Sequence, residues 1–289
     1  MRNNHRKFDP NTNAKFYIHL QQNTKKEKTM ILVGKKFELI LFLIILGLIY
    51  YMIDRARRGI KTPKVRKLAA LQALREVVGQ AAEQHKPIHI STGIGGLHDE
   101  WAPMTIAAMA IFRKVAEYAG EFGVPLKYYC IRAHMIPAME DLIQAGYTKG
   151  GRPEMYNSDM VEFVGDGQQR AYMAAVMGYI SREKPAANIM LGAGFYETYI
   201  VLGSGAVAGC LQVAGTPRLY YQGTVVALSD YPVIGQELYA AAAAITENPP
   251  DLGSLAGQDY GIVICSILMI VTALLATVGA TLWSQLLAW

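Results

Sequence analysis

Two long apolar segments frame this chain of 289 residues, and both are long enough to be tested as membrane spans. The first runs over residues 37–53, and the second runs over residues 260–289 without one charged side chain. About 20 apolar residues cross the roughly 30 Å of hydrocarbon in a bilayer. We therefore expect transmembrane helices at 37–53 and 259–289, with Trp283 and Trp289 near a membrane surface.

The residues that flank the first segment predict an orientation. No small-residue cleavage site follows it, and the chain continues as Asp54-Arg55-Ala56-Arg57-Arg58, so we interpret the segment as a retained anchor. Before it, residues 1–36 form a polar, basic tail. Lys and Arg number five in residues 21–36 and seven in residues 54–70. The positive-inside rule then predicts a cell-membrane protein with residues 54–258 on the cytoplasmic side.

The basic excess of the chain lies outside its central domain. Residues 1–60 hold 12 Lys and Arg against 4 Asp and Glu, whereas residues 61–258 hold 16 against 18. A nucleic-acid-binding domain of this size carries its basic excess on the folded part. We therefore expect the lipid bilayer, and no nucleic acid, as a partner.

Between the anchors, strand-like and helix-like stretches alternate. This pattern predicts an α/β domain, Rossmann-like, with a mainly parallel sheet and helices on both faces. We expect strands near residues 88–91, 126–131, 160–164, 188–191, 210–214 and 223–228. We expect helices near residues 65–84, 103–122, 136–145, 168–183, 196–207 and 232–245. Residues 248–258 are rich in Pro and Gly and predict a linker to the second anchor.

Polar residues and glycines follow the expected strands, where a parallel sheet gathers them at one edge. Glycines that open a helix let backbone N–H groups approach a phosphate or a carboxylate. We expect a site for a small anionic ligand at this edge, formed by Gly93, Gly95, Gly96, His98, Asp99, Arg132, Asp166, Gly194, Glu197 and Asp230.

The motifs of better-known chemistries are incomplete. The dinucleotide fingerprint G-x-G-x-x-G fails twice, because His98 and Glu197 stand where its third glycine belongs. The group of His98, Asp99, Glu100 and His134 has no specific metal-ligand spacing, so we interpret it as loop caps and expect no metal site. Neither a G-x-S-x-G elbow nor a P-loop occurs. The sequence therefore assigns no cofactor and no catalytic residue.

Two glycine turns repeat at an offset of 99 residues, Gly93-Ile94-Gly95 and Gly192-Ala193-Gly194. The same offset maps residues 126–130 onto residues 225–229. Either the domain has two related halves that meet at a crevice, or an alternating α/β chain produces the coincidence.

The second half of the domain resembles an uncharacterised bacterial and archaeal family of membrane-anchored proteins that carry a domain of unknown function. The matching pieces are Lys184 to Asn188, Gly192 to Glu197, Gln212 to Thr216, Asp230-Tyr231 and Gly235 to Leu238. The resemblance implies a Rossmann-like fold tethered to a membrane. It implies no activity and no catalytic residue.

Two functions are open at this point. The first is a membrane-anchored binding or assembly module whose domain forms homo-oligomers or joins a membrane protein complex, and holds a small anionic ligand. The second is a membrane-tethered enzyme acting on a nucleotide or small acid at the sheet edge, through His98, Asp99, Arg132, Asp166 and Glu197.

Overall fold

The computed structural model describes residues 36–60, 65–66 and 68–277. The chain divides into two compact units, an α/β unit of residues 53–255 and a helical unit that includes residues up to 52 and from 256. The expected basic tail, apart from Lys36, and the expected interfacial Trp283 and Trp289 lie outside the described residues.

The helical unit contains the two candidate membrane spans. Helices α2 (Lys36–Arg57) and α10 (Pro249–Thr277) are long and apolar enough to cross a bilayer. Their most apolar windows are 0% and 6% buried, unlike the core helix of a soluble domain. Two glycines of α10 bring the helices together, because a Cβ at Gly257 would lie 2.6 Å from Ile49 Cα and one at Gly261 would lie 3.4 Å from Ile45 Cγ2. This small-xxx-small spacing permits close helix packing in lipid.

The α/β unit is built on one parallel sheet of six strands in the order β3-β2-β1-β4-β5-β6. The strands are β1 (Ile88–Gly93), β2 (Leu126–Cys130), β3 (Val161–Phe163), β4 (Ala187–Ala193), β5 (Leu211–Thr216) and β6 (Tyr231–Ile234). This is the strand order of a doubly wound, Rossmann-like fold, so the predicted fold class is confirmed.

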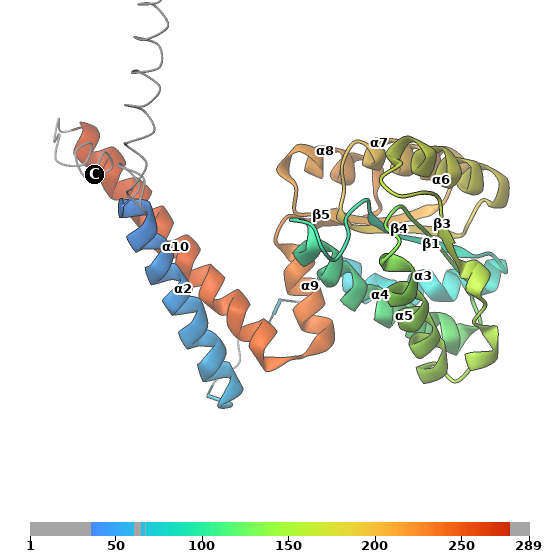
Figure 1. Ribbon diagram of the computed structural model, residues 1–289, viewed down its shortest axis with the longest axis horizontal. Coiled ribbons are helices and arrows are strands. Elements are labelled where there is room, and N and C mark those ends of the chain that lie inside the picture. The colour runs from blue at the N-terminus through green and yellow to red at the C-terminus, as the bar shows by residue number, and fades with distance from the viewer. Residues whose placement is uncertain (1–35, 61–64, 67, 278–289) are drawn as a thin grey trace, which may run out of the picture. The chain divides into compact units, whose positions relative to one another are not determined.

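Helices cover both faces of the sheet (Figure 1). One layer consists of α3 (Ala69–Gln84), α4 (Ala102–Phe122), α5 (Met135–Lys149) and α9 (Glu237–Thr246), and the other of α6 (Gln169–Glu183), α7 (Glu197–Ala208) and α8 (Leu219–Leu228). Short 3-10 turns at Pro153–Met155 and Ser158–Met160 precede β3. The apolar residues of β2 and β4 are split between the two layers by the period-2 alternation of a strand, which produces two hydrophobic cores.

The strand predicted at residues 223–228 is wrong, because these residues end helix α8. The sixth strand is β6, and it starts at Tyr231, so the helix predicted from Pro232 begins only at Glu237. Pro232 cannot donate a ladder hydrogen bond, but β6 is an edge strand paired with β5 alone, where a proline is tolerated. A uniformly apolar run with β-branched residues does not distinguish an outer helix from a strand.

The predicted linker at residues 248–258 is also wrong, because α10 is helical from Pro249 onward. Two prolines open this helix, where their missing N–H groups cost nothing. Gly257 lies inside the helix and is buried against Ile49 of α2. Here the prolines start a helix and the glycine allows a close contact between helices. Because Pro and Gly are also frequent in loops, composition alone does not distinguish these cases.

A buried polar ladder crosses the amino half of the sheet. His89 Nδ1 lies 2.8 Å from Asn188 Oδ1, and Asn188 Nδ2 donates to Gln212 Oε1 at 3.0 Å. These residues are register neighbours on β1, β4 and β5. His89 Nε2 is buried without a partner. Burial lowers the pKa of His89 to about 4, against a partial rise from the Asn188 hydrogen bond and a further lowering by Lys127.

We predict that Gly257→Ile separates α2 from α10, because a branched side chain at this position would overlap the backbone of Ile49. The measurement is disulfide formation between cysteines placed at Ile45 and Gly261 in a Cys265→Ser background, scored by gel mobility. The matched control is Gly47→Ile on α2, where nothing lies within 4 Å of the added Cβ. Equal cross-linking in both variants would show that the glycine contact does not hold the pair.

We predict that His89 makes the α/β unit sensitive to mild acid. Its folded pKa of about 4 lies below the ordinary 6.5, so the fold favours the neutral ring. At a pH above 6.5, the difference between the two pKa values contributes about 3 kcal/mol to the free energy of unfolding. This contribution is lost as the pH falls toward the folded pKa of about 4. Urea unfolding of the full chain in detergent, followed by circular dichroism, measures it. His89→Gln should reduce the dependence of the unfolding free energy on pH between about 4 and 6.5. An unchanged pH dependence would show that His89 is not the group responsible.

Candidate functional site

The carboxyl ends of β1 and β4 form the switch point of the sheet. These strands are neighbours, but the chain continues from β1 into α4 on one layer and from β4 into α7 on the other. In open α/β sheets the connections diverge at such a point, and ligands bind there. The turns after β1 and β4 are therefore the centre of the candidate site.

The glycines of these turns serve close packing. Gly93 has a φ of +73°, and a Cβ on it would overlap the carbonyl oxygen of Ala193. A Cβ at Gly95 would lie 2.6 Å from Ala193 Cβ and 2.7 Å from Thr105 Oγ1. A Cβ at Gly96 would lie 2.5 Å from His134 Nε2. The space that these glycines leave is filled by the protein itself, so they lock the two turns together.

Asp99 and His134 hold the turn after β1. Asp99 Oδ2 accepts the N–H of Gly96 at 2.8 Å, and its Oδ1 accepts the N–H of Trp101 at 3.0 Å. His134 Nε2 accepts the N–H of Leu97 at 2.9 Å, which leaves the proton of the neutral ring on Nδ1. The rings of His134 and His98 lie 4.5 Å apart. Asp99 and His134 therefore work as caps of the turn.

Glu197 holds the turn after β4 in a similar way. It is fully buried at the start of α7, where Oε1 accepts the N–H of Phe195 at 2.9 Å and Oε2 accepts from Gln169 Nε2 at 2.5 Å. Burial raises the pKa of the Glu197 carboxyl, although these hydrogen bonds and the charge of Arg218 oppose the rise. In each turn, a carboxylate of the protein thus accepts hydrogen bonds from backbone N–H groups to which a phosphate would otherwise bind.

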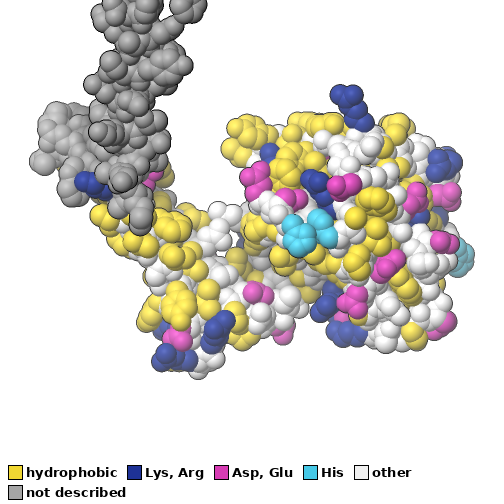
Figure 2. Space-filling model, in the orientation of Figure 1, with side chains coloured by type: hydrophobic (Ala, Val, Ile, Leu, Met, Phe, Trp, Pro, Cys, Tyr) yellow, Lys and Arg dark blue, Asp and Glu magenta, His cyan; other side chains and the backbone are white. Residues whose placement is uncertain are grey.

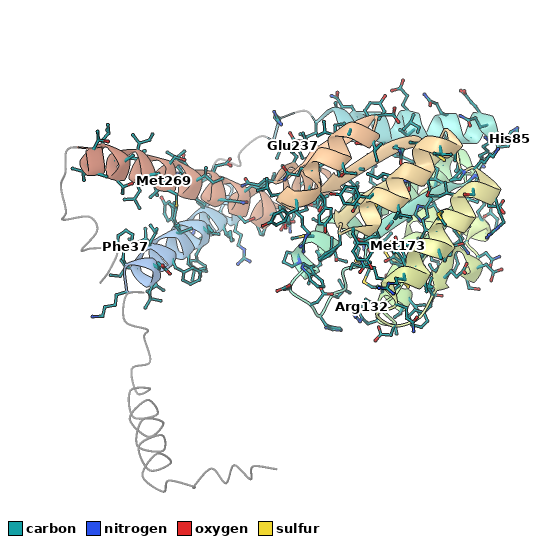
Figure 3. The ribbon with its side chains drawn as sticks, turned by 90° about the horizontal axis from the view of Figure 1, so that it is seen from above. Phe37, His85, Arg132, Met173, Glu237 and Met269 are labelled. Atoms are coloured by element: carbon teal, nitrogen blue, oxygen red, sulfur yellow. The ribbon has the colours of Figure 1, made fainter. Side chains whose placement is uncertain are left out.

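Arg132 lies beside the turn after β1. It directly follows β2 and Ile131, and its Cγ is 3.3 Å from the position of a Cβ on Gly96. Its Nη1 lies 4.0 Å from the corresponding position on Gly167, in the loop after β3. Figure 3 shows Arg132 on a different side of the α/β unit from His85, which precedes β1 at the amino edge.

Arg218 lies beside the turn after β4. It follows β5, and its guanidinium carbon stacks 3.7 Å from the centre of the Phe195 ring. Phe195 also packs against Trp101 from the turn after β1, with ring centres 4.7 Å apart. This aromatic contact joins the two turns and holds Arg218 at the switch point by a cation–π interaction.

Partnerless polar atoms gather at this edge. In the described parts of the chain, four buried side-chain polar atoms have no hydrogen-bond partner, and three of them are Arg132 Nε, Arg218 Nε and Thr198 Oγ1. Thr198 Oγ1 lies 2.6 Å from the position that a Cβ on Gly194 would occupy. Buried polar groups are almost always satisfied, so such a group calls for a specific explanation.

The structure brings most of the expected site residues to this edge. Asp166 is exposed in the loop after β3, and His98 is exposed in the turn after β1. Asp230 does not belong to the site, because it precedes β6 and accepts the N–H of Gln212 at the amino end of β5. The sequence places Asp230 in the site because it predicts a strand at residues 223–228, just before this residue, and that strand is wrong. Figure 2 shows exposed histidine side chains beside acidic and basic ones on the α/β unit.

Sequence reasoning missed Arg218, Thr198 and the Trp101–Phe195 contact. Arg132 was found because residues just after a parallel strand lie at the carboxyl edge of the sheet, and Arg218 follows the same rule. It was missed because the expected strand ended at residue 214, whereas β5 ends at Thr216. The ring contact joins residues far apart in the sequence and has no local signal. Among the described residues, no group of three or more His, Cys, Asp or Glu could hold a metal ion.

The fold and this edge define a doubly wound, Rossmann-like α/β protein with two candidate membrane spans. Residues 26–287 match the profile of a family described as a domain of unknown function, DUF6754. The match covers nearly the whole chain, and the chain therefore belongs to the DUF6754 family. No curated protein and no solved structure matches it.

We predict that Gly93→Ala destabilises the α/β unit by about 3 kcal/mol, because the added Cβ meets the Ala193 carbonyl oxygen at a left-handed φ. The matched control is Gly79→Ala in α3, where nothing lies within 4 Å of the new Cβ and alanine favours the helix by about 1 kcal/mol. Urea unfolding of the full chain measures both. Equal stability of the two variants would contradict the close contact of the turns.

Proposed function

We propose that this protein is a membrane-anchored binding module, and that its α/β unit holds a small anionic ligand at the switch point and assembles with other chains in the membrane. The α/β unit faces the cytoplasm, and the family is one of bacterial and archaeal membrane proteins. The apolar windows of α2 and α10, with mean hydropathies of 2.2 and 2.3, support the anchoring. The excess of Lys and Arg after the first span supports the orientation.

One observation carries the ligand proposal, namely the buried and partnerless Nε atoms of Arg132 and Arg218. A guanidinium is charged at every physiological pH and has five donors, which suit the oxygens of phosphate and carboxylate. The two arginines follow β2 and β5, the strands that flank β1 and β4. Strand spacing places their strands about 14 Å apart, so they bracket the switch point. An anionic group supplies the partners that these donors lack.

The turns themselves favour this mode over dinucleotide binding. In a dinucleotide site the pyrophosphate lies on glycine-turn N–H groups at a helix N-terminus. Here Asp99 and Glu197 accept from those turns, and a phosphate in the same place would meet a carboxylate. The arginines are therefore the better anion donors at this edge.

The same contacts favour binding over catalysis. Both oxygens of Asp99 and the Nε2 atom of His134 are engaged by backbone N–H groups. The single lone pair of His134 Nε2 is used by the N–H of Leu97, so this atom is not free to act as a general base. Asp99 and Glu197, two of the side chains that the sequence offers for catalysis, hold the turns, and the arginines bind charge without transferring a proton.

We predict that inorganic phosphate stabilises the full chain in nanodiscs, by about 1.4 kcal/mol at a concentration near ten times its dissociation constant. Arg132→Gln and Arg218→Gln should each lose most of this effect. Without phosphate, Arg132→Gln should not be destabilising, because the side chain has no hydrogen-bond partner to lose at Nε. Thermal unfolding monitored by fluorescence measures both properties.

The matched control is Arg113→Gln, which removes an exposed arginine of α4 and should keep the full phosphate effect. Native mass spectrometry from membranes then reports any bound small anion. Equal stabilisation of all variants, or none of the wild type by phosphate or by a dicarboxylate, would refute the proposal.

A further inference from the structure

The outer surface of α7 and α8 exposes large apolar side chains. Val207 is 91% exposed, Leu219 is 76% exposed and Tyr220 is 83% exposed. Hydrophobic side chains recur along the α6–α8 layer in Figure 2. We define the α7–α8 face by its exposed members: Tyr199, Ile200, Val207, Leu219, Tyr220 and Val226. Contiguous exposed apolar patches of this kind mark interaction surfaces.

The α7–α8 face carries almost no charge. Between residues 198 and 229 the only charged side chain is Arg218, and it is stacked on Phe195 with its Nε buried. Each helix buries one side against the sheet, and its exposed side is mostly apolar, with the partly exposed polar side chains Ser204, Gln222 and Thr224 among the apolar ones. A helix with this pattern is expected to be covered on its other side as well.

A groove adjoins the face on the α6 side. It has a volume of about 620 Å³, and its lining combines the apolar Met177, Tyr199, Ile200 and Val207 with the polar Ser181, Lys184 and Ser204. Gly203 lies along it, and nothing is within 4 Å of the place where its Cβ would be. An apolar side chain from a partner fits such a groove.

The chain enters and leaves the α/β unit on the opposite side of the sheet. Its first helix α3 and its last helix before α10, α9, both pack in the α4 layer. The α6–α8 layer lies across the sheet from them (Figure 1). Within the α/β unit, the α7–α8 face therefore lies across the sheet from the helix layer that contains α3 and α9.

We propose that the α7–α8 face is an interface between two copies of this chain. This deepens the assembly part of the proposed function and rests on it. In a two-fold symmetric interface, a surface patch packs against the same patch of the second copy. A patch with a net charge would repel its copy, whereas a neutral patch does not. The six residues are between 40% and 91% exposed, and they are available to a partner in an interface that takes about 800 Å² from each chain. Anchoring in one membrane raises the effective concentration of the second copy.

A lipid surface fits the face less well. Surfaces that bind membranes combine apolar side chains with Lys and Arg, which attract anionic lipid headgroups. The basic residues at the α7–α8 face and its groove are Arg218, which is stacked on Phe195, and Lys184 at the α6 side, without the cluster of Lys and Arg that such surfaces use.

The experiment uses the full chain in nanodiscs that hold either one or two copies, with hydrogen exchange of α7 and α8 as the readout. We expect protection of these helices in discs with two copies and its loss in discs with one. Sedimentation in mild detergent should show a dimer whose dissociation constant rises at least tenfold in Val207→Glu and in Val226→Glu. Both positions are exposed, so the variants should fold.

The matched control is Ile106→Glu, which places the same charge on an exposed apolar position of α4, in the other layer. It should leave the dimer unchanged. Protection that persists in single-copy discs would show that lipid covers the face, and a dimer that survives both valine substitutions would place the interface elsewhere. Either result overturns the proposal, and so does a wild-type chain that stays monomeric in detergent and in two-copy discs.

The anion site is tested separately on the same samples. Val207→Glu should retain the phosphate effect, because neither α7 at this position nor Val226 contacts the arginines. A dimer without a phosphate effect would refute the ligand proposal alone. A phosphate effect without a dimer would refute the interface alone.

Discussion

The direct contact between the turns after β1 and β4 is the constraint on which the candidate site depends. Gly93 and Gly95 let the first turn lie against Ala193, and Trp101 packs on Phe195 across the same boundary. These contacts fix the switch point of the sheet, and with it the positions of Arg132 and Arg218 on either side. A doubly wound fold usually leaves this point open for a ligand. Here the centre is filled by the protein, and the donors without partners flank it.

The carboxylates explain why a glycine-rich turn does not by itself define a phosphate site. Asp99 and Glu197 each occupy backbone N–H groups of a turn, so the positive end of the helix that follows is already matched by a side chain. Glu197 is retained in a fully buried place only because hydrogen bonds and the charge of Arg218 offset its desolvation in part. The carboxylates therefore stabilise the turns, and the Nε atoms of Arg132 and Arg218 are left without hydrogen-bond partners.

Two polar systems of the sheet have different consequences. At the amino edge, His89, Asn188 and Gln212 form a ladder inside the fold, whose histidine is held neutral by burial. At the carboxyl edge, the polar atoms of Arg132, Thr198 and Arg218 lack such partners. The ladder links three strands through side-chain hydrogen bonds and leaves one atom, His89 Nε2, without a partner, whereas the unpaired donors of two charged arginines at a switch point favour an anionic ligand. Within the α/β unit, α3 and α9 pack on one face of this sheet, and α7 and α8 pack on the other.

The sequence by itself determined the two apolar helices, the alternating α/β pattern and most residues at the strand ends, because hydropathy and periodicity are local properties. It did not separate helix α8 from a strand or the start of α10 from a linker, since Pro, Gly and uniform apolar runs take their meaning from what packs beside them. Only the tertiary structure decided the strand order and the exclusion of Asp230. It also decided that Glu197 is a capping group, a role that the sequence indicates for Asp99 but not for Glu197, and that Arg218 belongs to the site. Each of these depends on contacts between segments far apart in the chain, which no local pattern encodes.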